Sequence, residues 1–175
     1  MPNGIVNFKD YIRNIPDWPK KGILFRDITP LLADPQAFKL AIEVLCHGFK
    51  NGSVDYVAAV EARGFIFGSA VAEKIGAGFV PIRKKGKLPF KCESVTYELE
   101  YGTDTVEVHI DAFKKGAKVL MIDDLLATGG TMAAACKLVE KAGAQIEAIS
   151  FLIELRELCG REKLQDYDIR TIISY

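Results

Sequence analysis

Short apolar runs alternate along the chain with segments in which apolar residues recur at helical spacing. Each run is too short for an ordinary helix, and uninterrupted hydrophobicity is typical of strands buried on both faces of a parallel sheet. Such strands are expected at residues 54–60, 78–82, 119–122, 146–155 and 169–173. Because strands and helices alternate, the pattern indicates an α/β fold with a mainly parallel sheet flanked by helices.

Helices are expected between these strands. Asp34 is a suitable N-cap for a helix that starts at Pro35, and Asn51-Gly52 is expected to end it. A second helix should follow Gly64 and run to about Ile75. A third should bury one face, formed by Met132, Ala135, Cys136, Val139 and Ala142. Shorter helices are expected at residues 7–14 and 161–164.

Residues 94–101 and 105–110 alternate strictly between apolar and polar side chains, with Gly102-Thr103-Asp104 between them. This pattern predicts a β-hairpin with one packed face and one polar face. A solvated acidic face is the ordinary interpretation of its glutamates. The hairpin is expected as an insertion at about residues 90–110 in a single domain of residues 1–175.

Composition limits the classes of function. The 175 residues carry a formal net charge of +0, which gives no support to a general nucleic-acid or membrane-surface role. No apolar run approaches the roughly 20 residues of a membrane span, and the absence of a signal-peptide pattern predicts a cytoplasmic location. The four cysteines form no C-x-x-C pair and the two histidines are not placed as zinc partners, which favours reduced, structural thiols.

The strongest candidate for chemistry follows the apolar run at 119–122. Asp123 and Asp124 end this run, and Gly129-Gly130 lies between Thr128 and Thr131 before the third helix. Backbone N–H groups of such a loop, together with a helix N-terminus, can surround a phosphate. Adjacent carboxylates can accept hydrogen bonds from vicinal hydroxyls, so the ligand should be a ribose phosphate. An ordinary strand–helix connection with solvated acids is the alternative.

Three other segments are candidates for ligand contacts. Arg63 lies at a strand end before a glycine and a helix, which suits an anion, although a surface ion pair with Glu61 is equally possible. The densest basic cluster, residues 83–87, is either a solvated face or a partner for a phosphorylated ligand. Phe25 either fills the core or stacks on a flat ring.

Residues 123–131 resemble the phosphoribosyl-diphosphate-binding motif of the type I phosphoribosyltransferases, and their Leu-Leu-Ala-Thr-Gly-Gly-Thr form is similar to that of adenine phosphoribosyltransferases. Further strings resemble the same family in the family's order. These are residues 22–30, the base loop; residues 61–65, the pyrophosphate loop; residues 83–89, the basic loop; and residues 97–102, the mobile hood. Several motifs in order are far more specific than any one of them.

The resemblance implies a role for each matching residue. The ribose and 5′-phosphate would be held by Asp123, Asp124, Ala127, Thr128, Gly129, Gly130 and Thr131. The pyrophosphate would be held by Glu61, Ala62, Arg63, Arg83, Lys84 and Lys87. Adenine would lie against Leu24, Phe25, Arg26 and Leu155. Glu100 would transfer a purine proton, and Tyr101 would belong to the hood.

The implied reaction converts adenine and 5-phosphoribosyl 1-diphosphate to AMP and pyrophosphate, a step of purine salvage. The resemblance also implies Mg²⁺, bound through substrate oxygens and water rather than directly by the protein, and a homodimer. Two alternatives stay open. One is a phosphoribosyltransferase for another purine base, namely hypoxanthine, guanine or xanthine. The other is a non-catalytic regulator of the same fold.

Overall fold

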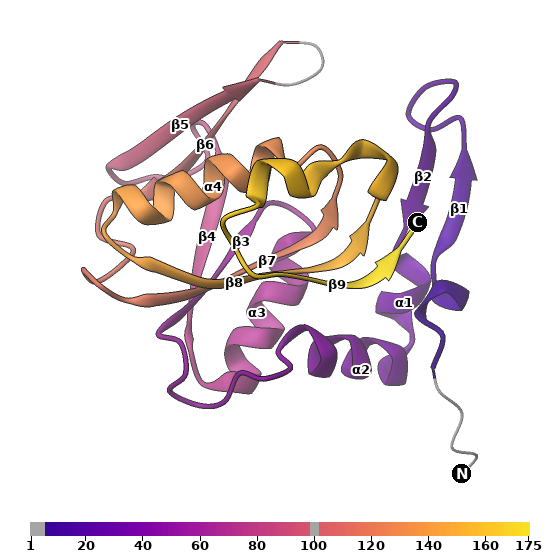
Figure 1. Ribbon diagram of the computed structural model, residues 1–175, viewed down its shortest axis with the longest axis horizontal. Coiled ribbons are helices and arrows are strands. Elements are labelled where there is room, and N and C mark those ends of the chain that lie inside the picture. Colours follow the sequence, from indigo (N-terminus) through magenta and orange to yellow (C-terminus); the bar gives the residue numbers. More distant parts are fainter. Residues whose placement is uncertain (1–5, 99–101) are drawn as a thin grey trace. The chain divides into compact units, whose positions relative to one another are not determined.

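The computed structural model describes residues 6–98 and 102–175 (Figure 1). The chain divides into two compact units, residues 1–44 and residues 45–175. Glu100 and Tyr101, to which the resemblance assigns roles in the hood, lie outside the described residues. Within the described residues, no helix is both long and apolar enough to cross a membrane.

The first unit contains a two-stranded antiparallel sheet and short helices. Its elements are η1 (Phe8–Tyr11), β1 (Arg13–Pro16), β2 (Leu24–Asp27), α1 (Thr29–Ala33) and α2 (Pro35–Leu45). The expected helix at residues 7–14 is wrong, because only one 3₁₀ turn forms before Arg13–Pro16 pairs with β2. Asp34 caps α2 as predicted, since its Oδ1 accepts from the backbone N–H groups of Gln36 and Ala37. α2 ends at Leu45 and not at Gly52.

The second unit is a seven-stranded sheet in the order β5-β6-β4-β3-β7-β8-β9, and it confirms the expected α/β fold. Five strands are parallel, namely β3 (Tyr56–Val60), β4 (Gly78–Lys84), β7 (Lys118–Leu126), β8 (Gln145–Glu154) and β9 (Ile169–Ser174). The helices are α3 (Gly64–Ile75), α4 (Gly130–Lys141) and the 3₁₀ turns η2 (Arg156–Leu158) and η3 (Gly160–Leu164).

The order of the parallel strands creates a crevice. The chain passes from β3 through α3 to β4 on one side, and from β7 through α4 to β8 on the other. Both crossovers are expected to be right-handed, so α3 and α4 cover opposite faces of the sheet (Figure 1). Neighbouring strands whose connections diverge in this way leave a ligand crevice at their carboxyl ends. Here that place is the end of β3 and β7.

The predicted hairpin is present as β5 (Cys92–Glu98) and β6 (Thr103–His109). The second strand starts at Thr103, two residues earlier than its alternation suggested, because Thr103 pairs with Glu98. β6 also pairs antiparallel with the end of β4, at Arg83 and Lys84. The hairpin therefore extends the sheet next to the carboxyl ends of β3 and β4.

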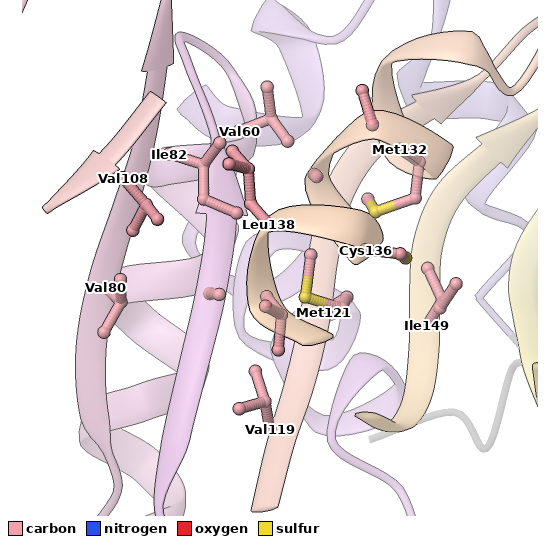
Figure 2. Close-up of a cluster of buried hydrophobic side chains, with 14 of the residues drawn as sticks. Val60, Val80, Ile82, Val108, Val119, Met121, Met132, Cys136, Leu138 and Ile149 are labelled. Carbon is pink, nitrogen blue, oxygen red and sulfur yellow. The ribbon is translucent and has the colours of Figure 1, made fainter. Parts of the chain in front are cut away.

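The core on the α4 side of the sheet anchors the site. Figure 2 shows Met132, Cys136 and Leu138 of α4 directed toward strand side chains, including Met121 of β7 and Ile149 of β8. All of these side chains are essentially inaccessible to solvent, as the apolar stripe of the helix predicted. Burying each large apolar side chain is worth about 1.5–3 kcal/mol. The first turn of α4 is thereby held firmly over the end of β7.

Candidate functional site

A cavity of about 460 Å³ lies at the carboxyl ends of β3 and β7. Its lining comes from Val60, Glu61, Ala62, Arg63, Lys84, Tyr97, Asp104, Val106, Asp123, Asp124, Leu125 and Thr131. Seven of the residues named from the sequence therefore share one space, although they come from three separate segments of the chain, residues 61–63, residue 84 and residues 123–131. Arg83 and Lys87 are not part of this lining.

The loop between β7 and α4 forms a second, smaller pocket of about 80 Å³. Residues 127–131 line it, and Gly129 adopts a φ of 76°, a left-handed conformation that favours glycine. α4 starts at Gly130, so the positive end of this 12-residue helix faces the pocket. Asp123, Leu125 and Thr131 line both the pocket and the larger cavity, so one ligand can extend from one into the other.

Gly160 supports this loop and was not found from the sequence. A Cβ atom on Gly160 would lie 2.2 Å from the carbonyl oxygen of Ala127, and one on Gly129 would lie 2.3 Å from the carbonyl oxygen of Gly160. Both distances are far below van der Waals contact, so both positions require glycine. No local pattern around Gly160 signals this contact, because its partners lie about 30 residues earlier in the chain.

The acidic pair at the end of β7 is desolvated. Burial raises the pKa of the Asp123 carboxyl well above its usual range, and the neighbouring Asp124 charge adds to this. Burial also raises the pKa of Asp124. The Arg63 guanidinium partly offsets this rise, because its Nε lies 2.9 Å from Oδ2 of Asp124. Gly64 lets the start of α3 approach, since a Cβ there would lie 2.7 Å from Oδ1 of Asp123.

Three of the four candidate cations of the site are paired with a carboxylate. Arg63 pairs with Asp124, Arg83 with Glu61 at 3.2 Å, and Lys84 with Asp104 at 3.0 Å. The sequence alternative of an Arg63–Glu61 pair is therefore wrong. The hydrogen bond and charge of Asp104 raise the pKa of Lys84.

Backbone groups complete this part of the site. Glu61 accepts a hydrogen bond of 2.5 Å from the backbone N–H of Lys84, and Arg83 donates one of 3.1 Å to the carbonyl of Lys87. The Lys87 side chain is exposed. The Glu61–Ala62 peptide, in the segment that resembles the pyrophosphate loop, is cis.

Tyr97 and Asp104, from the two strands of the hairpin, line the cavity, although the sequence assigned neither of them a ligand contact. The Thr131 hydroxyl donates to the Tyr97 hydroxyl at 3.0 Å, and the Tyr97 hydroxyl lies 3.5 Å from Oδ2 of Asp104. The alternation along β5 does place Tyr97 on the packed face of the hairpin. It could not identify the partner, because Thr131 is 34 residues away.

The residues predicted to contact the base belong to both units of the chain. In the first unit, Leu24 is exposed, Phe25 is half-buried with its ring edge-on to Trp18 at 4.3 Å, and Arg26 donates to Oδ1 of Asn14. In the second unit, Leu155 follows β8, and its N–H donates to the carbonyl of Leu126 at 2.9 Å. Leu155 is thus tied to the end of β7, next to the small pocket.

The lining of the cavity is compatible with Mg²⁺ carried by a ligand. No three His, Cys, Asp or Glu side chains are grouped as a metal site in residues 6–98 and 102–175. Mg²⁺ usually keeps several waters and binds through one or two carboxylates and substrate phosphates. Asp123 and Asp124, next to a pocket that suits a phosphate, fit that mode of binding.

Comparison with known proteins agrees with this geometry. A family model described as a phosphoribosyl transferase domain matches residues 30–174. An adenine phosphoribosyltransferase from Parvibaculum lavamentivorans is 56% identical over 167 residues, 95% of this chain and 95% of that protein. One from Methylobacterium radiotolerans is 52% identical over 172 residues, 97% of this chain and 95% of that protein.

Solved structures show the same similarity. The adenine phosphoribosyltransferase of Thermoanaerobacter pseudethanolicus superimposes with a TM-score of 0.91 at 53% identity, covering 96% of this chain and 98% of its own. The Giardia lamblia enzyme, solved in complex with 9-deazaadenine, gives a TM-score of 0.89 at 37% identity and covers 96% of each chain. This chain belongs to the phosphoribosyl transferase domain family and, within it, to the adenine phosphoribosyltransferases.

Proposed function

We propose that the chain transfers the 5-phosphoribosyl group of phosphoribosyl diphosphate to adenine, with AMP and pyrophosphate as products. One observation carries the proposal. Asp123 lines both a pocket suited to a phosphate and a larger cavity, and this cavity also contains Asp124, Arg63 and Lys84. A sugar with a phosphate at one end and a diphosphate at the other matches this order of groups. The relatives of more than 50% identity are named for the same activity.

The 5′-phosphate belongs in the small pocket. Backbone N–H groups of residues 127–131, the Thr128 and Thr131 hydroxyls and the N-terminus of α4 can all donate to or attract its oxygens. Asp123 and Asp124 then accept from the ribose hydroxyls. Fixing the sugar at both points restricts the position of C1, and correct positioning can contribute several kcal/mol to a reaction barrier.

The diphosphate belongs with the basic residues of the larger cavity. Arg63 and Lys84 line this cavity, Arg83 precedes Lys84 at the end of β4, Lys87 lies in the loop after β4, and Glu61 and Ala62 form the turn after β3. Arg63, Arg83 and Lys84 each contact a carboxylate in the absence of substrate. The diphosphate adds charge-assisted hydrogen bonds to these cations, and such bonds are about twice as strong as neutral ones.

In the chemical step, adenine N9 forms a bond to C1 of the ribose while the bond from C1 to the diphosphate oxygen breaks. The electron pair of that bond leaves with the pyrophosphate. The proton lost from adenine passes to the Glu100 carboxylate. Phe25 stacks on the base, and backbone groups of Leu24 and Arg26 read its edge; by the resemblance, Leu155 is also assigned to the base. Tyr101 belongs to the hood that keeps water from the activated sugar.

Mg²⁺ is the proposed cofactor. It would be held by substrate oxygens and water near Asp123 and Asp124, and when bound it offsets the negative charge of the leaving diphosphate. The resemblance further supports a homodimer in which the whole chain, residues 1–175, is one catalytic domain. A cytoplasmic location is consistent with Cys46, Cys92, Cys136 and Cys159, which are free thiols in this structure.

A single assay tests the activity. Purified protein, phosphoribosyl diphosphate and Mg²⁺ are mixed with adenine, hypoxanthine, guanine or xanthine separately, and nucleotide formation is followed by absorbance. AMP from adenine alone supports the proposal. Turnover of a 6-oxopurine instead would keep the sugar-phosphate site and overturn the base assignment. Binding of phosphoribosyl diphosphate without turnover of any base would favour the regulator of the same fold.

A further inference from the structure

The Tyr97 hydroxyl connects residues 127–131, the proposed phosphate loop, to the hairpin. Oη of Tyr97 accepts from the Thr131 hydroxyl at 3.0 Å and lies 3.5 Å from Oδ2 of Asp104. Asp104 has two better donors, because its Oδ2 is 3.0 Å from Nζ of Lys84 and its Oδ1 accepts from the Thr105 N–H at 2.8 Å. The bond from Tyr97 to Asp104 is thus the weakest of the four.

Binding of a phosphate at the loop conflicts with this arrangement. A phosphate dianion offers only acceptor oxygens, and Thr131 has only one hydroxyl proton. If Thr131 donates that proton to the phosphate, it can no longer donate to Tyr97. The Tyr97 hydroxyl also has one proton. By rotating about its C–O bond, this hydroxyl can donate to Oγ1 of Thr131 instead of to Asp104. Asp104 keeps Lys84 and Thr105 as donors, so this exchange leaves none of these polar groups without a partner.

We propose that Tyr97 is a positioning residue for the 5′-phosphate, whose hydroxyl reverses the Tyr97–Thr131 hydrogen bond so that the Thr131 proton points at the phosphate. This inference rests on the proposed role of residues 127–131. A hydroxyl that accepts a hydrogen bond becomes a stronger donor, because hydrogen bonds in a chain polarise one another. In the resulting series of hydrogen bonds, Tyr97 donates to Thr131, and Thr131 donates to the phosphate.

Two features of Tyr97 suit this role. Its ring is half-buried against the start of α4, where Cδ2 lies 3.5 Å from the position that a Cβ of Gly130 would take. The ring is thereby held in place while the hydroxyl proton changes direction. Burial also raises the pKa of Tyr97, so that its hydroxyl keeps the proton it must donate at neutral pH.

Tyr97→Phe removes the hydroxyl and keeps the ring. Titration calorimetry of full-length protein should show about 2–10-fold weaker binding of ribose 5-phosphate, the range expected for one hydrogen bond. Binding of magnesium pyrophosphate, which does not fill the small pocket, should be unchanged. Tyr167→Phe is the matched control, because the Tyr167 hydroxyl donates at 2.6 Å to Glu140, in the last turns of the same helix. It should bind both ligands like the wild type.

A double-mutant cycle with Thr131→Val identifies the hydrogen bond as the cause. Once Thr131 has lost its hydroxyl, adding Tyr97→Phe should weaken ribose 5-phosphate binding no further. Independent losses from the two changes, an equal loss for both ligands, or unchanged affinity of Tyr97→Phe would each overturn the inference. If wild-type protein does not bind ribose 5-phosphate at all, the proposed phosphate site itself fails, and the inference fails with it.

Discussion

At the scale of single residues, several cations of the site are paired with carboxylates before any ligand arrives. Arg63 is the central example, because it faces Asp124, whose carboxyl is desolvated next to that of Asp123. Removing one partner of a buried pair leaves the other charge uncompensated, which costs more than the pair itself contributes. Arg63 therefore has two roles, one toward the acidic pair and one toward the proposed diphosphate.

Arg63→Ala should weaken binding of phosphoribosyl diphosphate about 10–100-fold, because a hydrogen bond to a charged group contributes about 1.5–3 kcal/mol. Titration calorimetry measures this directly. Arg63→Lys is the informative control, since it keeps the charge but loses the planar, forked donor, and it should recover only part of the affinity. Unchanged affinity in Arg63→Ala would refute the assignment of Arg63 to the diphosphate.

Glu100→Ala should lower kcat about 10²–10⁴-fold, the usual contribution of a positioned acid–base group, with little change in phosphoribosyl-diphosphate affinity. Steady-state kinetics and calorimetry on the same preparation separate the two effects. Glu98→Ala is the matched control, because Glu98 is an exposed residue at the end of β5, two positions away. A Glu100→Ala variant with full kcat would remove the proposed role.

At the scale of elements, the phosphate loop depends on the segment that follows β8. Gly160 of η3 packs directly on the loop, and its neighbour Arg161 fixes η3 to the sheet. Arg161 donates to both carboxylate oxygens of Glu154 at 2.6 and 2.9 Å, and to the hydroxyl of Thr171 at 3.2 Å. β8, η3 and β9 are thus joined at the point where the loop needs support.

Gly160→Ala should displace the phosphate loop, because its Cβ would overlap the Ala127 carbonyl. We expect loss of ribose 5-phosphate binding by more than 10-fold, measured by calorimetry. Gly78→Ala controls for a general loss of stability, since a Cβ there would lie 2.8 Å from the Tyr56 ring, at the other end of the parallel strands. That variant should melt at a lower temperature yet bind the ligand normally. Normal binding by Gly160→Ala would contradict the role of Gly160.

The Glu154–Arg161 contact should make stability depend on pH. The hydrogen bonds from Arg161 lower the pKa of Glu154 in the folded state. The stabilisation is therefore complete above the unfolded-state pKa of about 4.3 and is lost as the pH falls through the lower folded-state value.

Urea unfolding at several pH values tests this dependence. The difference in unfolding free energy between wild type and Glu154→Gln should be largest near pH 7 and shrink below about pH 4. Glu147→Gln is the control, because its pair with Lys118 is exposed and should contribute at most about 1 kcal/mol. A difference for Glu154→Gln that stays constant with pH would contradict the argument.

At the scale of the whole molecule, most residues assigned to the base and all residues assigned to phosphoribosyl diphosphate belong to different units of the chain. The residues assigned to the sugar, phosphate and diphosphate belong to residues 45–175, whereas Leu24, Phe25 and Arg26 belong to residues 1–44. The crevice at β3 and β7 exists because the crossovers through α3 and α4 diverge from adjacent strands. Substitutions at residues 24–26 should therefore affect adenine and leave the affinity for phosphoribosyl diphosphate unchanged.

Phe25→Ala should raise KM for adenine about 10-fold, since base–aromatic stacking is worth about 1–3 kcal/mol. Affinity for phosphoribosyl diphosphate should stay at the wild-type value. Phe25→Tyr retains the ring and should restore most of the adenine affinity. If the alanine variant instead lost phosphoribosyl-diphosphate affinity and kept its KM for adenine, the assignment of the base loop would be wrong.

The sequence by itself determined the features that depend on neighbouring residues. Continuous apolar runs predicted the parallel strands, because burial on both faces requires apolar side chains at every position. The Asp-Asp and Gly-Gly stretch predicted the glycine loop between β7 and α4, which we propose as the ribose-phosphate site, since an acidic strand end, a glycine turn and a helix start are all local. Alternation predicted the hairpin, apart from its exact ends.

Only the tertiary structure decided which distant groups meet. It paired Arg63 with Asp124 and Glu61 with Arg83, and it placed Gly160 against Ala127 and Tyr97 against Thr131. It also made residues 13–16 a strand instead of a helix, because the partner strand β2 supplies hydrogen bonds that a local pattern cannot reveal. Sequence periodicity reports which face of an element is buried, whereas contacts between elements depend on how those buried faces pack together.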